Sequence, residues 1–232
     1  MLNLVLDIET LPCDEKTRDI LPEISPPSRL KTEKQISEWK KKMLPKLKEN
    51  QLLFTALNPN YGRIFCIGMF FFDDEKDFYK AISFHGNEEK PLLKEFWQKL
   101  KENNYPYVIT YNGLGFDLPF IWKRSVILAV EGTKEFNLRR YTTDYNYDIM
   151  AVWCNWDVRN AIKLDNLTKI LGVESKSGSG ADVYDMWQKR EYKKIAEYCM
   201  QDVFVTYQCY SRMNFLTTKD HSKIDIEYKE FF

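Results

Sequence analysis

The first half of the chain alternates apolar runs with short polar stretches. Residues 2–8, 63–72 and 79–85 are rich in β-branched and aromatic side chains, a pattern typical of buried strands. The polar residues 73–76 predict a hairpin turn between the second and third runs, which makes those strands antiparallel neighbours. Residues 107–111 predict a further short strand.

After Pro91 the apolar positions take up helical spacing, which predicts a helix ending near residue 103. Further helices are predicted over residues 118–130, over 164–171 with Gly172 closing the helix, and over 193–212. A strand that returns to the sheet through a helix fits a parallel crossover. The order of elements therefore predicts an α/β fold with a mixed β-sheet flanked by helices, and a C-terminal third that is helical.

Length and composition favour one globular domain over residues 1–232. The chain is 44% hydrophobic, which is ample for a sizeable core. Its 34 lysines and arginines balance 34 acidic residues, so there is no overall positive field and an anionic partner must be held locally.

Five cysteines without a CxxC pair favour a reducing, cytoplasmic compartment. No signal peptide and no membrane-spanning apolar run are evident.

Two segments stand apart from this scheme. A charged insertion is predicted at about residues 14–60, and within it residues 29–49 hold eight basic and three acidic side chains. Such a run is commonly a solvated helix face, and the alternative is a phosphate-binding surface. The Ser-Lys-Ser-Gly-Ser-Gly stretch at 175–180 is either a connector or a substrate-facing lid.

Acidic residues mark three of the predicted elements. Asp7 and Glu9 end the first strand, and the two-residue period of a strand places both carboxylates on one face. Asp117 follows a strand end, where it suits either helix capping or catalysis. Tyr198 and Asp202 are four residues apart on the long helix and share one of its faces. If the fold brings the four carboxylates together, a divalent cation with hard oxygen ligands, Mg²⁺ or Mn²⁺, is what offsets their repulsion.

Three segments resemble, in order and spacing, the exonuclease motifs of the DEDDy group. They are Asp-Ile-Glu-Thr at 7–10, Asn-x-x-x-Phe-Asp at 112–117 and Tyr-x-x-x-Asp at 198–202. The resemblance extends over residues 2–212 and points to stand-alone exonucleases related to the proofreading domain of family B DNA polymerases. The similar segments also include Gly62-Arg63-Ile64, Tyr147-Asp148-Ile149-Met150 and Leu164-Asp165-Asn166-Leu167.

This resemblance implies a ribonuclease H-like fold and 3′-5′ exonuclease activity with two bound divalent ions. In the mechanism that we infer, Asp7 bridges the ions, Glu9 and Asp202 complete the first site, and Asp117 holds the second. Tyr198 orients the attacking water, because a phenol that titrates near pH ~10 is a poor base at neutral pH. The sister group uses a histidine at the position that Glu197 occupies here.

The resemblance further implies that the terminal nucleotide contacts Thr10, Leu11, Asn112 and Phe116. For Leu11 and Phe116 the alternative is ordinary core packing. The expected substrate is single-stranded DNA or a DNA 3′ end. Two alternatives stay open at this point: an exonuclease acting on RNA, and a non-catalytic nucleic-acid-binding module on the same fold.

Overall fold

The computed structural model describes residues 1–173, 183–218, 220 and 223–232. The stretch at 175–180, expected to be a connector or a lid, lies outside the described residues. Contacts divide the chain into two compact units, one formed by residues 1–9 and 64–232 and the other by residues 10–63. The single-domain organisation with an insertion at about 14–60 stays a prediction. No helix among the described residues is long and apolar enough to cross a membrane.

The larger unit is built on a six-stranded mixed sheet with strand order β5-β4-β1-β2-β3-β6. β2 and β3 are antiparallel, whereas β4 pairs in parallel with both β1 and β5, and β6 pairs in parallel with β3. The predicted hairpin and the predicted parallel crossover are thereby confirmed. The strands are β1 (Asn3–Leu11), β2 (Arg63–Asp73), β3 (Phe78–Gly86), β4 (Tyr107–Thr110), β5 (Asn146–Asp148) and β6 (Ile226–Phe231).

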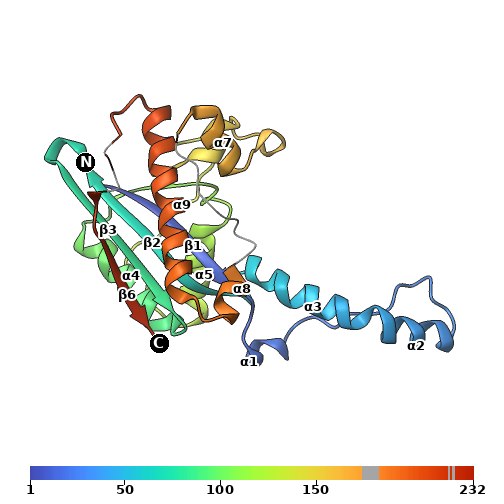
Figure 1. The fold of residues 1–232 in the computed structure, drawn as a ribbon. Helices are drawn as coiled ribbons and strands as arrows, with labels where there is room; N and C mark the ends of the chain where they lie inside the picture. The colour runs from blue at the N-terminus through green and yellow to red at the C-terminus, as the bar shows by residue number, and fades with distance from the viewer. Residues whose placement is uncertain (174–182, 219, 221–222) are drawn as a thin grey trace. The chain divides into compact units, whose positions relative to one another are not determined.

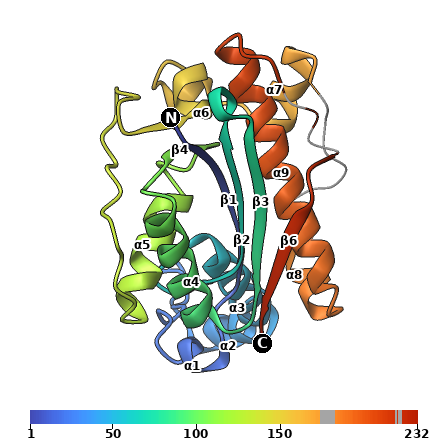
Figure 2. The ribbon, with the colours of Figure 1, turned by 90° about the vertical axis from the view of Figure 1, so that its left-hand side faces the viewer.

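Helices cover both faces of this sheet (Figures 1 and 2). One apolar cluster joins alternate residues of β1 to α4 and α5, and a second joins the opposite face to α6, α7 and α9. This two-sided burial confirms the predicted α/β class. The helices of the unit are α4 (Glu89–Glu102), α5 (Asp117–Ile127), α6 (Ile149–Trp153), α7 (Leu164–Leu171), α8 (Val183–Gln188) and α9 (Tyr192–Met213).

The predicted helices and strands are present, with bounds that move by a few residues, but two strands were missed. β5 has only three residues, too few for a period to show. β6 contradicts the expectation of a wholly helical C-terminal third. It is an edge strand whose residues are half-buried or exposed and carry charges, so it lacks the apolar run that marks a central strand.

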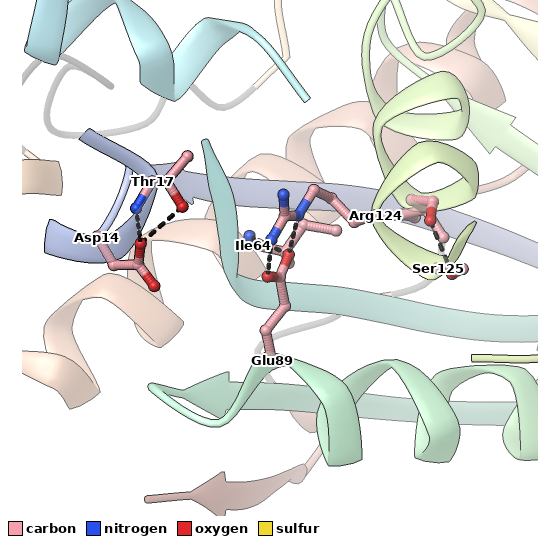
Figure 3. A network of polar contacts seen from close by, with 7 residues as sticks. Asp14, Thr17, Ile64, Glu89, Arg124 and Ser125 are labelled. Carbon is pink, nitrogen blue, oxygen red and sulfur yellow. Dashed lines mark hydrogen bonds and ion pairs between the residues drawn. The ribbon is translucent and has the colours of Figure 1, made fainter. Parts of the chain in front are cut away.

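A buried ion pair ties α4 and α5 to the start of β2 (Figure 3). The Glu89 carboxylate accepts hydrogen bonds from Arg124 Nε at 2.9 Å and from Arg124 Nη2 at 2.7 Å. Its Oε1 also accepts from the backbone N–H of Ile64 at 2.8 Å. Both side chains are about 8% exposed, so neither charge is well solvated. The pair therefore stabilises the fold mainly because each partner would be costly to bury alone.

The unit formed by residues 10–63 is largely helical, with α1 (Glu15–Arg18), α2 (Glu33–Lys42) and α3 (Leu44–Phe54). Asp14 caps α1 through Thr17, as Figure 3 shows, and Thr32 forms a capping box with Gln35 at the start of α2. Helices α2 and α3 contain no buried residue. Their lysine-rich surface is therefore solvated within this unit.

We predict that Arg124→Met lowers the free energy of unfolding by about 3–5 kcal/mol, because it leaves the Glu89 carboxylate buried without its cation. Adding Glu89→Gln should restore most of that loss, since glutamine is neutral and still accepts from Ile64. Urea denaturation of the single and double variants measures both effects. A double variant no more stable than Arg124→Met would show that burial of the charge is not the cause.

Candidate active site

The alternation of β1 separates its apolar core residues from its carboxylates. Leu4, Leu6 and Ile8 join the apolar cluster under α4 and α5. Val5 joins the opposite cluster, which contains α9, so Asp7 and Glu9 follow Val5 on the α9 side. The two carboxylates and the thiol of Cys199 offer atoms that lie within 4.8 Å of one another. The predicted placement of Asp7 and Glu9 on one face is therefore present in the structure.

Helix α9 carries Tyr198 and Asp202, and it packs closely on the sheet. A Cβ atom at Gly68 of β2 would lie 2.9 Å from Val203 Cγ2 and 3.0 Å from Cys199 Sγ, so a larger residue would require these α9 side chains to shift. Glycine at this position thus permits the close approach of α9 to β2. Tyr198 and Asp202 are 6% and 8% exposed, so they occupy the buried side of the helix.

Asp117 reaches β1 instead of capping α5. The N-cap position of α5 is Phe116, without a side-chain hydrogen bond, and Asp117 is the first helical residue. Its Oδ1 accepts from the backbone N–H of Ile8 at 3.1 Å, between the two acidic residues of β1. The capping role considered for Asp117 is therefore wrong, because its carboxylate makes a tertiary contact that the sequence could not show.

Burial raises the pKa of Asp117 to about 7. Loss of hydration is the largest cause, and the negative charges of Asp148 and Asp202 add to it, whereas hydrogen bonds from the backbone N–H groups of Asp117 and Ile8 act in the opposite direction. The influence of Asp202 shows that the carboxylates of α5 and α9 share one electrostatic environment. The Asp117 carboxylate therefore lies at the latter part of β1, and the charge of Asp202 on α9 acts on it.

Two residues of this region were not assigned a role from the sequence. The Cys199 thiol lies 3.6 Å from both the backbone oxygen and Oδ2 of Asp7, and its own burial raises its pKa well above the ordinary value. It therefore stays protonated at neutral pH and donates to Asp7. Nothing in its sequence neighbourhood marks this contact, which exists only because α9 lies against β1.

Asp148 organises the turn before α5. Its Oδ1 accepts from the backbone N–H groups of Asn112 and Ala151, and its Oδ2 accepts from that of Leu114, at 3.0–3.1 Å. Asn112 has a φ of 63°, so the turn contains a left-handed residue that these bonds hold in place. The sequence signal was the position of Asp148 before the short helix α6, where an aspartate caps well.

Most of the chain is similar to one family of known proteins. Residues 55–229 match the family described as "Predicted 3'-5' exonuclease related to the exonuclease domain of PolB". The chain belongs to this exonuclease family. The match includes Asp117, Tyr198 and Asp202, and it begins after Asp7 and Glu9.

The relatives of this exonuclease-family chain include much longer DNA polymerases. The DNA polymerase of Thermococcus litoralis is 30% identical over 145 residues, which are 53% of this chain and 8% of the relative. DNA polymerase 1 of Saccharolobus solfataricus is 31% identical over 150 residues, 57% of this chain and 16% of the relative. The chain therefore spans less than a fifth of the length of these polymerases.

The fold matches a solved family B DNA polymerase from Pyrobaculum calidifontis with a TM-score of 0.54 and 12% identity. This match covers 93% of the exonuclease-family chain and 24% of the polymerase chain. At such low identity the likeness concerns the fold alone. It confirms the mixed α/β sheet flanked by helices that the sequence predicts, and it is consistent with the ribonuclease H-like fold.

The four predicted nucleotide contacts lie in different settings. Thr10 and Leu11 belong to the smaller unit, where the Thr10 hydroxyl donates to the backbone oxygen of Ala56 at 2.7 Å and Leu11 is buried. Asn112 lies in the turn held by Asp148. Phe116 is half-buried and packs on Phe120, with ring centroids 5.3 Å apart. Their contact with a nucleotide stays a prediction.

We predict that metal-free protein loses stability as the pH rises, because of Asp117. A carboxyl group whose folded pKa, about 7, exceeds the unfolded value of 3.8 stabilises the fold at low pH and loses that contribution between these two values. Asp117→Asn removes the titration, so its stability relative to wild type should grow from pH 4 to pH 8, by up to roughly 4 kcal/mol.

Urea denaturation in EDTA at several pH values measures this difference. Asp157→Asn is a suitable control, because Asp157 lies on the surface next to Arg159 and its pKa is lowered. A stability difference between wild type and Asp117→Asn that did not change with pH would contradict the raised pKa.

Proposed function

We propose that this protein is a metal-dependent 3′-5′ exonuclease of the DEDDy type, acting on single-stranded DNA. The observation that carries the proposal is the pair Asp7 and Glu9 on β1, with Asp117 bonded to the backbone N–H between them and Asp202 acting electrostatically on Asp117. Family membership supplies the direction of cleavage, because the family is described as 3′-5′ exonucleases. The five free thiols are consistent with a reducing compartment, which we propose to be the cytoplasm.

The residues present fit a pair of divalent ions such as Mg²⁺ or Mn²⁺. Carboxylate oxygens are hard ligands that these ions prefer, and the Asp7 and Glu9 oxygens lie within 4.8 Å of each other. Burial raises the pKa of Asp117, and the nearby charges of Asp148 and Asp202 raise it further. Bound cations would offset this excess of negative charge. Cys199 belongs to the same group of side chains, and its thiol donates to Asp7 at 3.6 Å.

In this proposal Asp7, Glu9, Asp117 and Asp202 would hold the two ions. When bound, the ions would supply activation of a water and stabilisation of charge on the leaving 3′-oxygen. The protein's own contribution is positional. Gly68 lets α9 bring Asp202 toward β1, and the N–H of Ile8 orients Asp117. The thiol of Cys199 donates to Oδ2 of Asp7 and so helps to orient that carboxylate.

Tyr198 is assigned to orient the attacking water through its hydroxyl group. It lies four residues before Asp202 on the same helix, so the two side chains share a face. Among the described residues no histidine takes this role: His85 is fully buried on β3 with its pKa lowered by burial, and Glu197 occupies the position that a histidine would need.

DNA is the favoured substrate because the relatives are DNA polymerases. The same four carboxylates could also cleave RNA, and discrimination would require a contact to the 2′-hydroxyl group. A non-catalytic module is the weaker alternative, because such a module has no need of the four acidic residues, all of which are present.

The direct test uses purified protein, Mg²⁺ or Mn²⁺, and matched 5′-labelled single strands of DNA and RNA. Wild type should shorten the labelled DNA stepwise from its 3′ end. Asp7→Asn and Asp202→Asn should each slow this by a factor of at least about 100, because each removes a charged metal ligand. The comparison between the two strands decides the sugar preference.

Glu75→Gln is the matched control, since it neutralises an acidic residue that is exposed near the β2–β3 turn. It should degrade DNA at the wild-type rate. Undiminished degradation by either aspartate variant would rule out the proposed site. Faster shortening of RNA than of DNA would replace the DNA assignment with the RNA alternative.

A further inference from the structure

The smaller unit carries a positive charge that the balanced total conceals. Residues 10–63 contain 11 lysines and arginines against seven acidic residues, a net charge of +4. The rest of the chain has 23 basic and 27 acidic residues, a net charge of −4. The eight basic side chains between residues 29 and 49 are all exposed. A polyanion would therefore be attracted to this unit in preference to the rest of the chain.

Helix stability explains only part of this charge. Lys40, Lys41 and Lys42 form the last turn of α2, where cations interact favourably with the helix dipole. Lys46, by contrast, lies in the first turn of α3, which contains no acidic residue, so the α3 dipole opposes it. The lysines continue across the break between the two helices. The α3 dipole therefore gives no reason for a cation at Lys46.

Lysines of both helices also face a common concavity. Lys40 of α2 and Lys48 of α3 line a groove of about 730 Å³, together with Arg18. Glu23 and Glu49 line it too, so the groove itself is only weakly positive. Further positive charge comes from Lys41, Lys42 and Lys46, which do not line the groove and are exposed.

We propose that the lysines of residues 40–48 bind the phosphate backbone of a single-stranded nucleic acid. The inference rests on the proposed function. It gives the protein a second nucleic-acid-binding surface in addition to the active site. These lysines belong to the unit that follows Glu9 in the chain, and they lie outside the residues that match the exonuclease family. Because the two surfaces are covalently linked, phosphate contacts at the lysines raise the effective concentration of the strand for the active site.

The test compares a long single-stranded oligodeoxynucleotide with a trinucleotide. The variant Lys40→Gln/Lys41→Gln/Lys42→Gln keeps residues of good helix propensity. Its affinity for the long strand, measured by fluorescence anisotropy in EDTA, should fall by roughly tenfold or more, and the slope of log K against log salt should decrease by about 2. Degradation of the trinucleotide in Mg²⁺ should keep the wild-type rate.

The control variant is Lys90→Gln/Lys94→Gln/Lys101→Gln, which removes the same charge from exposed positions of α4. It should bind the long strand with near wild-type affinity. An equal loss in both triple variants would overturn the proposal, because the effect would then be one of net charge. Slower trinucleotide degradation by the Lys40–Lys42 variant would overturn it as well.

The experiment separates this proposal from the proposed function. If the wild-type protein binds the strand through the lysines but does not shorten it in Mg²⁺, the proposed exonuclease activity is refuted and the proposed lysine surface is supported. Wild type that shortens the strand, with an affinity that the three lysines do not affect, would refute the surface alone.

Discussion

The structure depends on concentrating carboxylates where little water remains to solvate them. Glu9, Asp117 and Asp202 are each less than 10% exposed, and Asp7 adjoins Glu9 on the same face of β1. Carboxylates in such a place repel each other and lose hydration, and the raised pKa of Asp117 reports this cost. A protein retains an arrangement of this kind when a bound cation or a reaction requires it.

The surrounding fold serves to hold that arrangement. The β1 alternation directs apolar side chains to one layer of helices and carboxylates to the other. Gly68 allows α9 to approach the sheet, and Asp148 fixes the turn that leads into α5. Each acidic residue is thus positioned by an element whose own stability comes from ordinary packing and hydrogen bonding elsewhere.

Sequence periodicity predicted the parts of the site that depend on local geometry. The two-residue period placed Asp7 and Glu9 on one face, and the four-residue separation placed Tyr198 and Asp202 on one side of a helix. It could not predict contacts between elements. Asp117 looked like a helix cap because its partner, the N–H of Ile8, is 109 residues away in sequence. Cys199 and Asp148 were missed for the same reason, and β6 because its edge position leaves it half-exposed.

The smaller unit shows how a neutral total charge can mislead. The balance of 34 basic and 34 acidic residues argued against a general affinity for nucleic acid, yet the two units differ in sign. In our account, the negatively charged unit binds metal ions through its carboxylates. The positively charged unit that follows Glu9 binds the nucleic-acid strand. The family match begins at residue 55, so it includes Asp117 and Asp202 but neither Asp7 and Glu9 nor the lysines of residues 40–48.

Manganese binding tests the central claim most directly, because it measures the acidic site without relying on turnover. Electron paramagnetic resonance of free Mn²⁺ should show wild type binding two ions per chain. Asp202→Asn should bind fewer ions or bind them at least about tenfold more weakly, whereas Tyr198→Phe should bind as wild type does, since its hydroxyl is assigned to water and not to metal. Identical Mn²⁺ binding by wild type and Asp202→Asn would contradict the account.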